Sequence, residues 1–335
     1  MRILNIVLCI YIVLTQSALA DTDTQNITFL RIGTGGAGGT YYPIGGLLAQ
    51  AVSAPPGSRT CEQGGSCGVP GLVAIAQSSN GSVANVKAIQ SGNLESGFAQ
   101  SNIAFWAYSA SGIFKGQKPM KKLRTIASLY PESIHLVARR GSGINSVWDL
   151  RGKRVSLDEP GSGTLVDATI VINAYGLTRH DIKAEYIKPN LAAERIEQNK
   201  LDAFFIVAGY PTNSVKNLTK NKGAKLIPID GLEAEKILLK HRFYSPNKIP
   251  AGIYSGVRET KTLSVGAQWL IGADIDEQLV YKITRALWND NSRKLLNNGH
   301  AKGRTISLQT ALNGVSVKLH PGAERYYKEI GLLKK

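Results

Sequence analysis

The sequence predicts an α/β protein built from two similar halves, and three observations carry this prediction. Short apolar strands repeatedly end in small polar loops that open helices, which is typical of α/β folds whose strand ends meet at a crevice. The order of strand, glycine loop and helix also occurs twice, because the glycine loop at residues 33–39 has a counterpart at residues 158–163. Finally, the chain has 335 residues, which is more than one simple core holds, so two domains are expected.

The first glycine loop shows the pattern most clearly. Residues 26–32 contain bulky apolar side chains of the kind that favour β-strands, so they predict a strand. Residues 33–39 follow, with five glycines in seven positions. From Thr40 onward, apolar residues recur at helical spacing. A glycine loop lets the backbone approach a ligand, and the free N–H groups of the next helix favour a negative group. The stretch therefore predicts an anion-binding loop, provided that it lines a cleft.

Two other interpretations of this loop exist. Residues 33–38 match the dinucleotide pattern G-x-G-x-x-G, but that pattern needs a second strand with an acidic residue about 20 residues further on. Residues 54–62 stand there instead and predict a loop. A nucleotide site is therefore disfavoured, whereas a tight turn that only packs the helix on the strand stays open.

The rest of the chain continues the alternation of strands and helices. Thr164 opens a helix with Asp167 three residues on, which resembles a capping box. Asp274 is expected to cap the helix at residues 275–288. Strands are expected at residues 71–77, 96–102, 123–130, 134–138, 153–157, 182–186, 202–211 and 263–270. Further helices are expected at residues 83–94, 164–174, 191–200, 232–241 and 320–329, with a connecting loop at residues 249–256.

The first 20 residues have the pattern of a secretory signal peptide. Arg2 supplies the positive start, residues 3–14 are apolar apart from Asn5, and residues 18–20 form an A-x-A cleavage site. A membrane anchor is the alternative, but this apolar run is much shorter than the roughly 20 residues that a span needs. Cleavage would remove Cys9 and place the mature protein in the periplasm.

Two cysteines remain after cleavage, Cys61 and Cys67. No histidine lies near them, and a zinc site wants four ligands. In an exported protein a local disulfide is the better interpretation, and it would pin one loop.

The chain is strongly basic, with 40 Lys and Arg against 24 Asp and Glu and a net charge of +16. Loss of Arg2 with the signal leaves 39 basic residues against 24 acidic ones, which gives +15. Nucleic acid is one interpretation of such a charge, but export and the scattered positions of the charges argue against it. A field that gathers small anions and a merely solvated cationic surface both stay open.

Eight blocks of sequence carry a resemblance to a known family. They are GTGGAGGTYYPIGG at Gly33, SSNGSVANV at Ser78, SGFAQSN at Ser96, LYPESIHLVARR at Leu129, DLRGKRVSLDEPGSGT at Asp149, LDAFFIVAGYP at Leu201, IPAGIY at Ile249 and LHPGAERYYKE at Leu319. In this order they resemble the TAXI family of solute-binding proteins, the extracytoplasmic receptors of TRAP transporters. The resemblance runs from about residue 28 to residue 332.

This resemblance implies a type II periplasmic-binding-protein fold, in which two α/β lobes joined by two crossover strands close over a small ligand. The first lobe would hold residues 28–130 and 262–335, and the second residues 131–261. The ligand would be a small carboxylate, either a glutamate-like amino acid or a dicarboxylate such as 2-oxoglutarate, delivered to TRAP membrane subunits. A monomer without cofactor or metal is expected. Family members often carry Asp where this chain has Asn102, which favours a ligand without an amino group.

Polar loops at the strand ends predict the ligand site, because α/β folds bind ligands there. For each hydroxyl in these loops, a helix cap is the alternative role. The residues expected to line the site are Gly39, Thr40, Tyr42, Asn80, Ser82, Gln100, Ser101, Ser162, Gly163, Thr164, Gly209 and Tyr210.

The same loops predict how charge is recognised. No Lys or Arg occurs at residues 33–50, 78–86 or 157–174. We therefore expect neutral N–H groups at two helix starts to hold the ligand's carboxylate. If an ion pair contributes instead, Arg31 and Arg154 are the first candidates.

Enzymatic activity is not expected from this sequence. No H-E-x-x-H motif occurs, and the five histidines are dispersed. His135 falls at the predicted hinge, where a hydrogen bond to the backbone is favoured over a catalytic role. Two classes of function remain: a transport receptor that closes over a small acid, and a periplasmic or surface interaction or sensory module that reuses the same fold.

Overall fold

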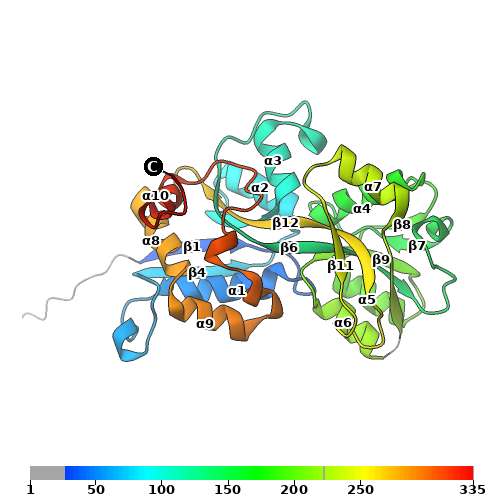
Figure 1. The fold of residues 1–335 in the computed structure, drawn as a ribbon, viewed down its shortest axis with the longest axis horizontal. Helices are drawn as coiled ribbons and strands as arrows, with labels where there is room; N and C mark the ends of the chain where they lie inside the picture. Colours follow the sequence, from blue (N-terminus) through cyan, green and yellow to red (C-terminus); the bar gives the residue numbers. More distant parts are fainter. Residues whose placement is uncertain (1–26, 222, 335) are drawn as a thin grey trace, which may run out of the picture.

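Two long antiparallel strands run through the centre of the molecule and join two groups of elements (Figure 1). The computed structural model describes residues 27–221 and 223–334, so the expected signal peptide lies outside the described residues. The two strands are β6 (Leu123–Arg139) and β12 (Thr260–Gly272). The sheet order is β4-β1-β5-β12-β6-β9-β7-β8, with β10 paired to β6 and β11 to β12. The expected α/β fold with two crossover strands is confirmed.

The first group of elements lies on one side of Figure 1, and the second group lies on the other. The first comprises β1 (Thr28–Gly33), α1 (Tyr41–Val52), β2 (Ser53–Ala54), β3 (Val69–Pro70), β4 (Leu72–Gln77), α2 (Ser82–Ser91), β5 (Ser96–Gln100), α3 (Ser101–Ser109), α8 (Glu277–Leu287), α9 (Asp290–Gly299) and α10 (Pro321–Glu329). The second comprises β7 (Arg154–Ser156), α4 (Gly163–Ala174), β8 (Lys183–Glu185), α5 (Pro189–Glu197), β9 (Ala203–Ala208), α6 (Asn213–Lys220), β10 (Ala224–Ile227), α7 (Gly231–Lys240) and β11 (Ser245–Ile249). Within the described ranges, no helix is both long enough and apolar enough to cross a membrane.

Each group has its own apolar core, and the two long strands contribute to both. On β6, Ile126 and Leu129 pack in a core of the first group, whereas Leu136 packs in a core of the second. On β12, Leu263 packs in the second group and Trp269 in the first. The strands therefore act as the connection between two separately packed bodies. The exact lobe boundaries stay a prediction.

One strand stands where the sequence predicts two. Pro131 suggests a break between residues 123–130 and 134–138, yet β6 continues through it without interruption. Pro131 lies opposite Gly266, and the pairing of β6 with β12 shifts register beside this point, between Ala267 and Gln268. A proline lacks the N–H that a regular ladder needs, and irregular pairing of this kind is where strands tolerate it.

Two further local expectations are corrected. The segment before the expected loop at residues 249–256 forms β11, which pairs with β12 and had no alternating apolar pattern to reveal it. Asp276, rather than Asp274, caps α8, because Asp276 Oδ1 accepts a hydrogen bond from Leu279 N at 2.7 Å.

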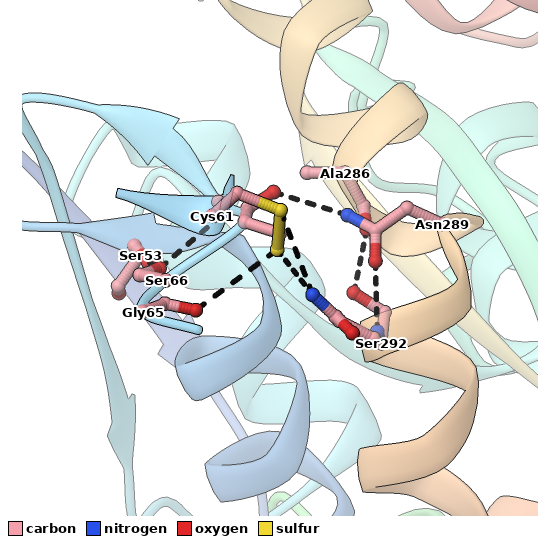
Figure 2. Close-up of a disulfide and its surroundings, with 10 residues drawn as sticks. Ser53, Cys61, Gly65, Ser66, Ala286, Asn289 and Ser292 are labelled. Carbon is pink, nitrogen blue, oxygen red and sulfur yellow. Dashed lines mark hydrogen bonds between the residues drawn. A yellow bond between two sulfur atoms is a disulfide. The ribbon is translucent and has the colours of Figure 1, made fainter. Parts of the chain in front are cut away.

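The disulfide between Cys61 and Cys67 is confirmed, with the two Cα atoms 4.6 Å apart. Figure 2 shows the disulfide-bonded loop beside the start of α9. Asn289 caps that helix by accepting from Ser292 N at 2.8 Å, and its Nδ2 donates to Cys67 O at 3.0 Å. Asn291 Nδ2 also donates to the two disulfide sulfurs, so two asparagines hold the loop against α9.

A partly buried ion network stabilises the second group. Asp202 precedes β9, and its two oxygens accept hydrogen bonds from Arg154 Nε at 3.0 Å and Nη2 at 2.8 Å. Arg139 of β6 adds a third contact at 3.0 Å. The Arg154 guanidinium, with smaller help from Arg139, holds the pKa of Asp202 well below its usual range.

We therefore expect Asp202→Asn to lower the free energy of unfolding at pH 7 by about 1–3 kcal/mol. The folded-state pKa lies below the unfolded value of about 3.9, so the stabilisation is fully present above that value and is lost progressively as the pH falls from it towards the folded-state pKa. Urea unfolding between pH 7 and pH 2.5 should show the gap between wild type and variant narrowing with acid. A gap that stays constant would contradict the assignment.

Candidate functional site

The candidate site is a cleft between the two groups, at the ends of the strands. Five helices begin at it, and each contributes an N-cap residue or its neighbour to the lining. The N-cap residues are Thr40 for α1, Gly81 for α2, Gln100 for α3, Ser162 for α4 and Lys188 for α5. Because the first-turn N–H groups of a helix have no partner within the helix, five such ends make the cleft rich in neutral donors.

Hydrogen bonds cross this cleft directly, so the two groups are in a closed arrangement. Thr40 Oγ1 donates to Gly209 O at 2.5 Å, and Asn80 Nδ2 donates to Pro160 O at 3.0 Å. Backbone atoms also pair, with Ala84 N donating to Gly161 O at 2.9 Å. The two glycine loops singled out in the sequence therefore lie on opposite walls.

Eight of the twelve residues expected at the site line this cleft. They are Gly39, Thr40, Asn80, Ser82, Gln100, Ser162, Gly163 and Thr164. Their role in binding stays a prediction, but the structure brings them together from four different helix starts, those of α1, α2, α3 and α4.

The other four expected residues lie elsewhere. Tyr42 is 42% exposed on the outer side of α1, and the neighbouring Tyr41 lines the cleft in its place. Ser101 is buried at the start of α3, behind Gln100. Gly209 contributes a carbonyl to Thr40, and the ring of Tyr210 lies under the Lys302 ammonium at 3.7 Å. Helical periodicity could not decide between Tyr41 and Tyr42, because both are aromatic residues in the first turn.

The hydroxyl groups of the lining are already engaged with the protein. Ser162 caps α4 by accepting from Leu165 N at 3.0 Å, so the cap belongs to Ser162 and the expected capping box at Thr164 is wrong. Thr164 Oγ1 instead accepts from Val207 N at 3.1 Å. Ser82 Oγ accepts from Gln100 N at 3.1 Å. These bonds fix the walls, and the hydroxyl groups that accept in them can still donate their O–H, beside the free backbone N–H groups of the helix starts.

Acidic residues in the lining are the part that the sequence reasoning missed. Glu132, Asp158 and Glu159 all line the cleft, and Lys188 lines it as the only cation among the described residues there. Glu132 and Asp158 lie in blocks that carry the family resemblance, PES and LDEPGSG, so a search of those blocks for charge would have found them. Asp158 has a φ of 73°, a left-handed conformation that non-glycine residues rarely adopt.

Burial dominates the electrostatics of these acids. Glu132 is 2% exposed, and burial raises its pKa well above the usual range, although a hydrogen bond from Tyr41 at 2.7 Å opposes this. Burial also raises the pKa of Asp158 to about 7. A buried carboxyl group keeps its proton unless a cation or several donors compensate the charge.

Asn102 lies outside the lining and joins the two groups behind it. Its Nδ2 donates to Asp167 Oδ1 at 2.9 Å, and the same oxygen accepts from Tyr244 OH at 2.6 Å. Both Asn102 and Asp167 are fully buried. The expectation that Asn102 reports on a ligand amino group is therefore not supported, because its partner is a carboxyl group of the protein.

This contact predicts the effect of Asn102→Asp. Burial already raises the pKa of Asp167 to about 7, and a second carboxyl group would force the pair to share a proton. Raised folded-state pKa values favour the protonated form. The free energy of unfolding that the variant loses is therefore small near pH 4 and grows as the pH rises. We expect a loss of about 1–3 kcal/mol in unfolding free energy at pH 8. Urea unfolding measures it, with exposed Asn93→Asp as control; equal losses at both pH values would refute the contact.

The remaining candidates for charge recognition and hinge chemistry are accounted for by structural contacts. Arg31 pairs with Glu95 and Arg154 with Asp202, and neither arginine lines the cleft. His135 is 1% exposed, with Nδ1 at 2.9 Å from Ser133 O, which is the backbone hydrogen bond expected for it.

Comparisons with known proteins found one family model and several solved structures that are similar to this chain. A structure from Bordetella bronchiseptica RB50 has a TM-score of 0.50 and 15% identity, over 89% of this chain and 82% of that chain. The alkanesulfonate-binding protein SsuA from Xanthomonas axonopodis pv. citri bound to MOPS has a TM-score of 0.48 and 18% identity, over 90% and 83%. PhnD1 from Prochlorococcus marinus in complex with methylphosphonate has a TM-score of 0.46 and 11% identity, over 91% of this chain and 99% of that chain. At 15% identity the likeness to the structure from Bordetella bronchiseptica concerns the fold alone. Residues 32–331 match the NMT1-like family, and the chain belongs to that family.

Proposed function

We propose that this protein is an extracytoplasmic solute receptor that closes over a small carboxylate. One observation carries the proposal: five helix N-termini from both groups converge on a cleft that hydrogen bonds hold closed. Such ends supply free N–H donors and partial positive charge, which suit a carboxylate group. The two crossover strands provide the connection about which the groups would open and release it.

We propose more specifically that the receptor belongs to the TAXI type and delivers its ligand to a TRAP permease. The support is the ordered resemblance of eight sequence blocks, several of which form the cleft. The blocks at Gly33, Ser78, Ser96 and Asp149 contribute the starts of α1, α2, α3 and α4. The segments that resemble the family are thus the ones that meet at the candidate site.

A mass spectrum of small molecules released from freshly purified, denatured protein would identify the ligand. Calorimetry against small carboxylic acids should then show tight binding of one acid at a 1:1 ratio. A protein that carries no small molecule and binds none of the acids would overturn the receptor proposal. That result would favour the alternative of an interaction or sensory module that reuses the fold.

Delivery to a permease is tested separately. Uptake of the identified ligand into proteoliposomes with candidate TRAP subunits should require this protein and an ion gradient. Uptake that requires ATP and a different permease would overturn the TRAP assignment and leave the receptor function intact.

A further inference from the structure

A second concave region, here called the basic groove, lies in the first group. It has a volume of about 1040 Å³, and among the described residues it shares no lining residue with the cleft between the groups. One side is the disulfide-bonded loop at residues 54–70, and the other is formed by α8 and the start of α9 (Figure 2). The basic groove is therefore separate from the proposed receptor site.

Cations outnumber acids in the basic groove. The acids that line it are Glu62 and Asp290, and the cations are Arg59 of the loop, Lys282 and Arg285 of α8, and Lys294 of α9. All four cations are exposed, and none of them forms an ion pair with another described residue. Like charges without counter-ions repel one another, so an anionic partner in the groove would be attracted and would relieve this repulsion.

The two sides of the basic groove are fastened to each other. Asn289 Nδ2 on the helix side donates to Cys67 O at 3.0 Å, and Asn291 Nδ2 donates to both sulfurs of the disulfide. The backbone of Arg59 is tied to the same loop, because its carbonyl accepts from Ser66 N at 3.1 Å. A surface that is already ordered loses little conformational entropy when a partner binds, so the groove is suited to recognition.

The lining favours a polypeptide over a small anion or a membrane. Cations that come from three segments distribute charge over the groove, whereas one phosphate-sized anion contacts only a few donors at a single point. Pro55 and Pro70 also line the groove, and their apolar surface suits the side chains between acidic residues of a peptide. A flat membrane would meet protruding side chains rather than the lining of a concave surface. We propose that the basic groove binds an acidic polypeptide segment of a partner protein.

Fluorescence anisotropy of a labelled peptide made of three Glu-Glu-Leu repeats tests the proposal with the full mature chain. The wild type should bind this peptide saturably at a 1:1 ratio, and the affinity should fall as the salt concentration rises. The matching peptide with Gln in place of Glu should bind at least tenfold more weakly. A wild type that binds neither peptide, or both equally, overturns the proposal.

Lys282→Glu combined with Lys294→Glu reverses two charges on the helix side. Arg285 is kept, because a cation in the last turn of α8 also stabilises that helix end. Each exposed ion pair contributes little, but reversal replaces two attractions by two repulsions, so we expect about tenfold weaker binding of the acidic peptide. Lys87→Glu combined with Lys118→Glu is the matched control, since both lysines are exposed and line neither the groove nor the cleft.

The control separates a site from the general charge of the protein. It should keep nearly the wild-type affinity, and equal weakening in the two double variants would overturn the site. Arg59→Glu tests the loop side and should weaken the acidic peptide several-fold. An unchanged affinity in that variant would place the peptide on the helices alone and overturn the groove.

Two further probes decide between a polypeptide and other anions. Inorganic phosphate that binds the wild type as tightly as the acidic peptide would overturn the polypeptide in favour of a small anion. Vesicles of phosphatidylethanolamine and phosphatidylglycerol that bind more tightly than the peptide, and lose binding in the Lys282→Glu and Lys294→Glu double variant, would overturn it in favour of a membrane. Each of these results leaves the cleft and the receptor proposal unaffected.

Discussion

Gly163→Val is expected to leave the protein folded and to prevent its cleft from closing. Gly163 starts α4 in the second group, and a Cβ there would lie 1.9 Å from Gln100 Oε1 and 3.0 Å from Ser82 Oγ of the first group. Both neighbours are across the cleft, so the clash exists only in the closed form. Overpacking of this kind costs about 1–3 kcal/mol, which corresponds to a loss of roughly 5- to 150-fold in affinity for a ligand bound by closure.

Two measurements check this expectation. Calorimetry with the identified ligand gives the affinity, and small-angle X-ray scattering should give a larger radius of gyration for the variant than for the wild type. Gly46→Ala is the control, because a Cβ at that exposed position of α1 meets nothing within 4 Å. A variant that binds and scatters like the wild type would show that the walls do not approach as described.

Trp269→Ala should cause the largest loss of stability among single substitutions considered for this chain. Trp269 lies on β12, is 0% exposed and packs in the core of the first group. Truncation of a buried Trp removes apolar contacts and leaves a cavity, which costs about 3–5 kcal/mol. Its indole N–H has no hydrogen-bond partner among the described residues, so burying this group already costs free energy in the wild type. We therefore expect a loss near the lower end of that range, about 3 kcal/mol.

Urea unfolding followed by circular dichroism measures this loss. Trp148→Ala serves as the control, because Trp148 is 52% exposed and makes a T-shaped contact with the Tyr175 ring, with centroids 4.9 Å apart. The control should cost less than about 1 kcal/mol. Equal losses in the two variants would contradict the assignment of Trp269 to the core.

Local sequence was sufficient for most of the elements and for the positions of the loops. A strand, a glycine loop and a helix start in succession leave little choice of structure, since glycine permits the turn and periodicity defines the helix face. Eight predicted residues therefore meet at one cleft. The disulfide also followed from spacing and compartment, because two cysteines six positions apart can only close a local loop.

Three of the failures share one cause, which is that the deciding contact is distant in sequence. Pro131 looks like a strand end until β12 pairs beside it with a register shift. Tyr41 and Tyr42 differ only in which one meets Glu132, 91 residues further along the chain. β11 has no alternating pattern because most of its residues are exposed, and only pairing with β12 reveals it.

The sequence by itself determined the α/β class, the strand-loop-helix units and the polar residues at their junctions, because these depend on backbone freedom and apolar spacing over a few positions. Only the tertiary structure decided which charges lie inside the cleft. Arg31 and Arg154 pair with Glu95 and Asp202, Asn102 donates to Asp167, and Glu132 is buried in the cleft, where it accepts a hydrogen bond from Tyr41. Charge pairing depends on three-dimensional proximity and desolvation, and neither is encoded in the local order of residues.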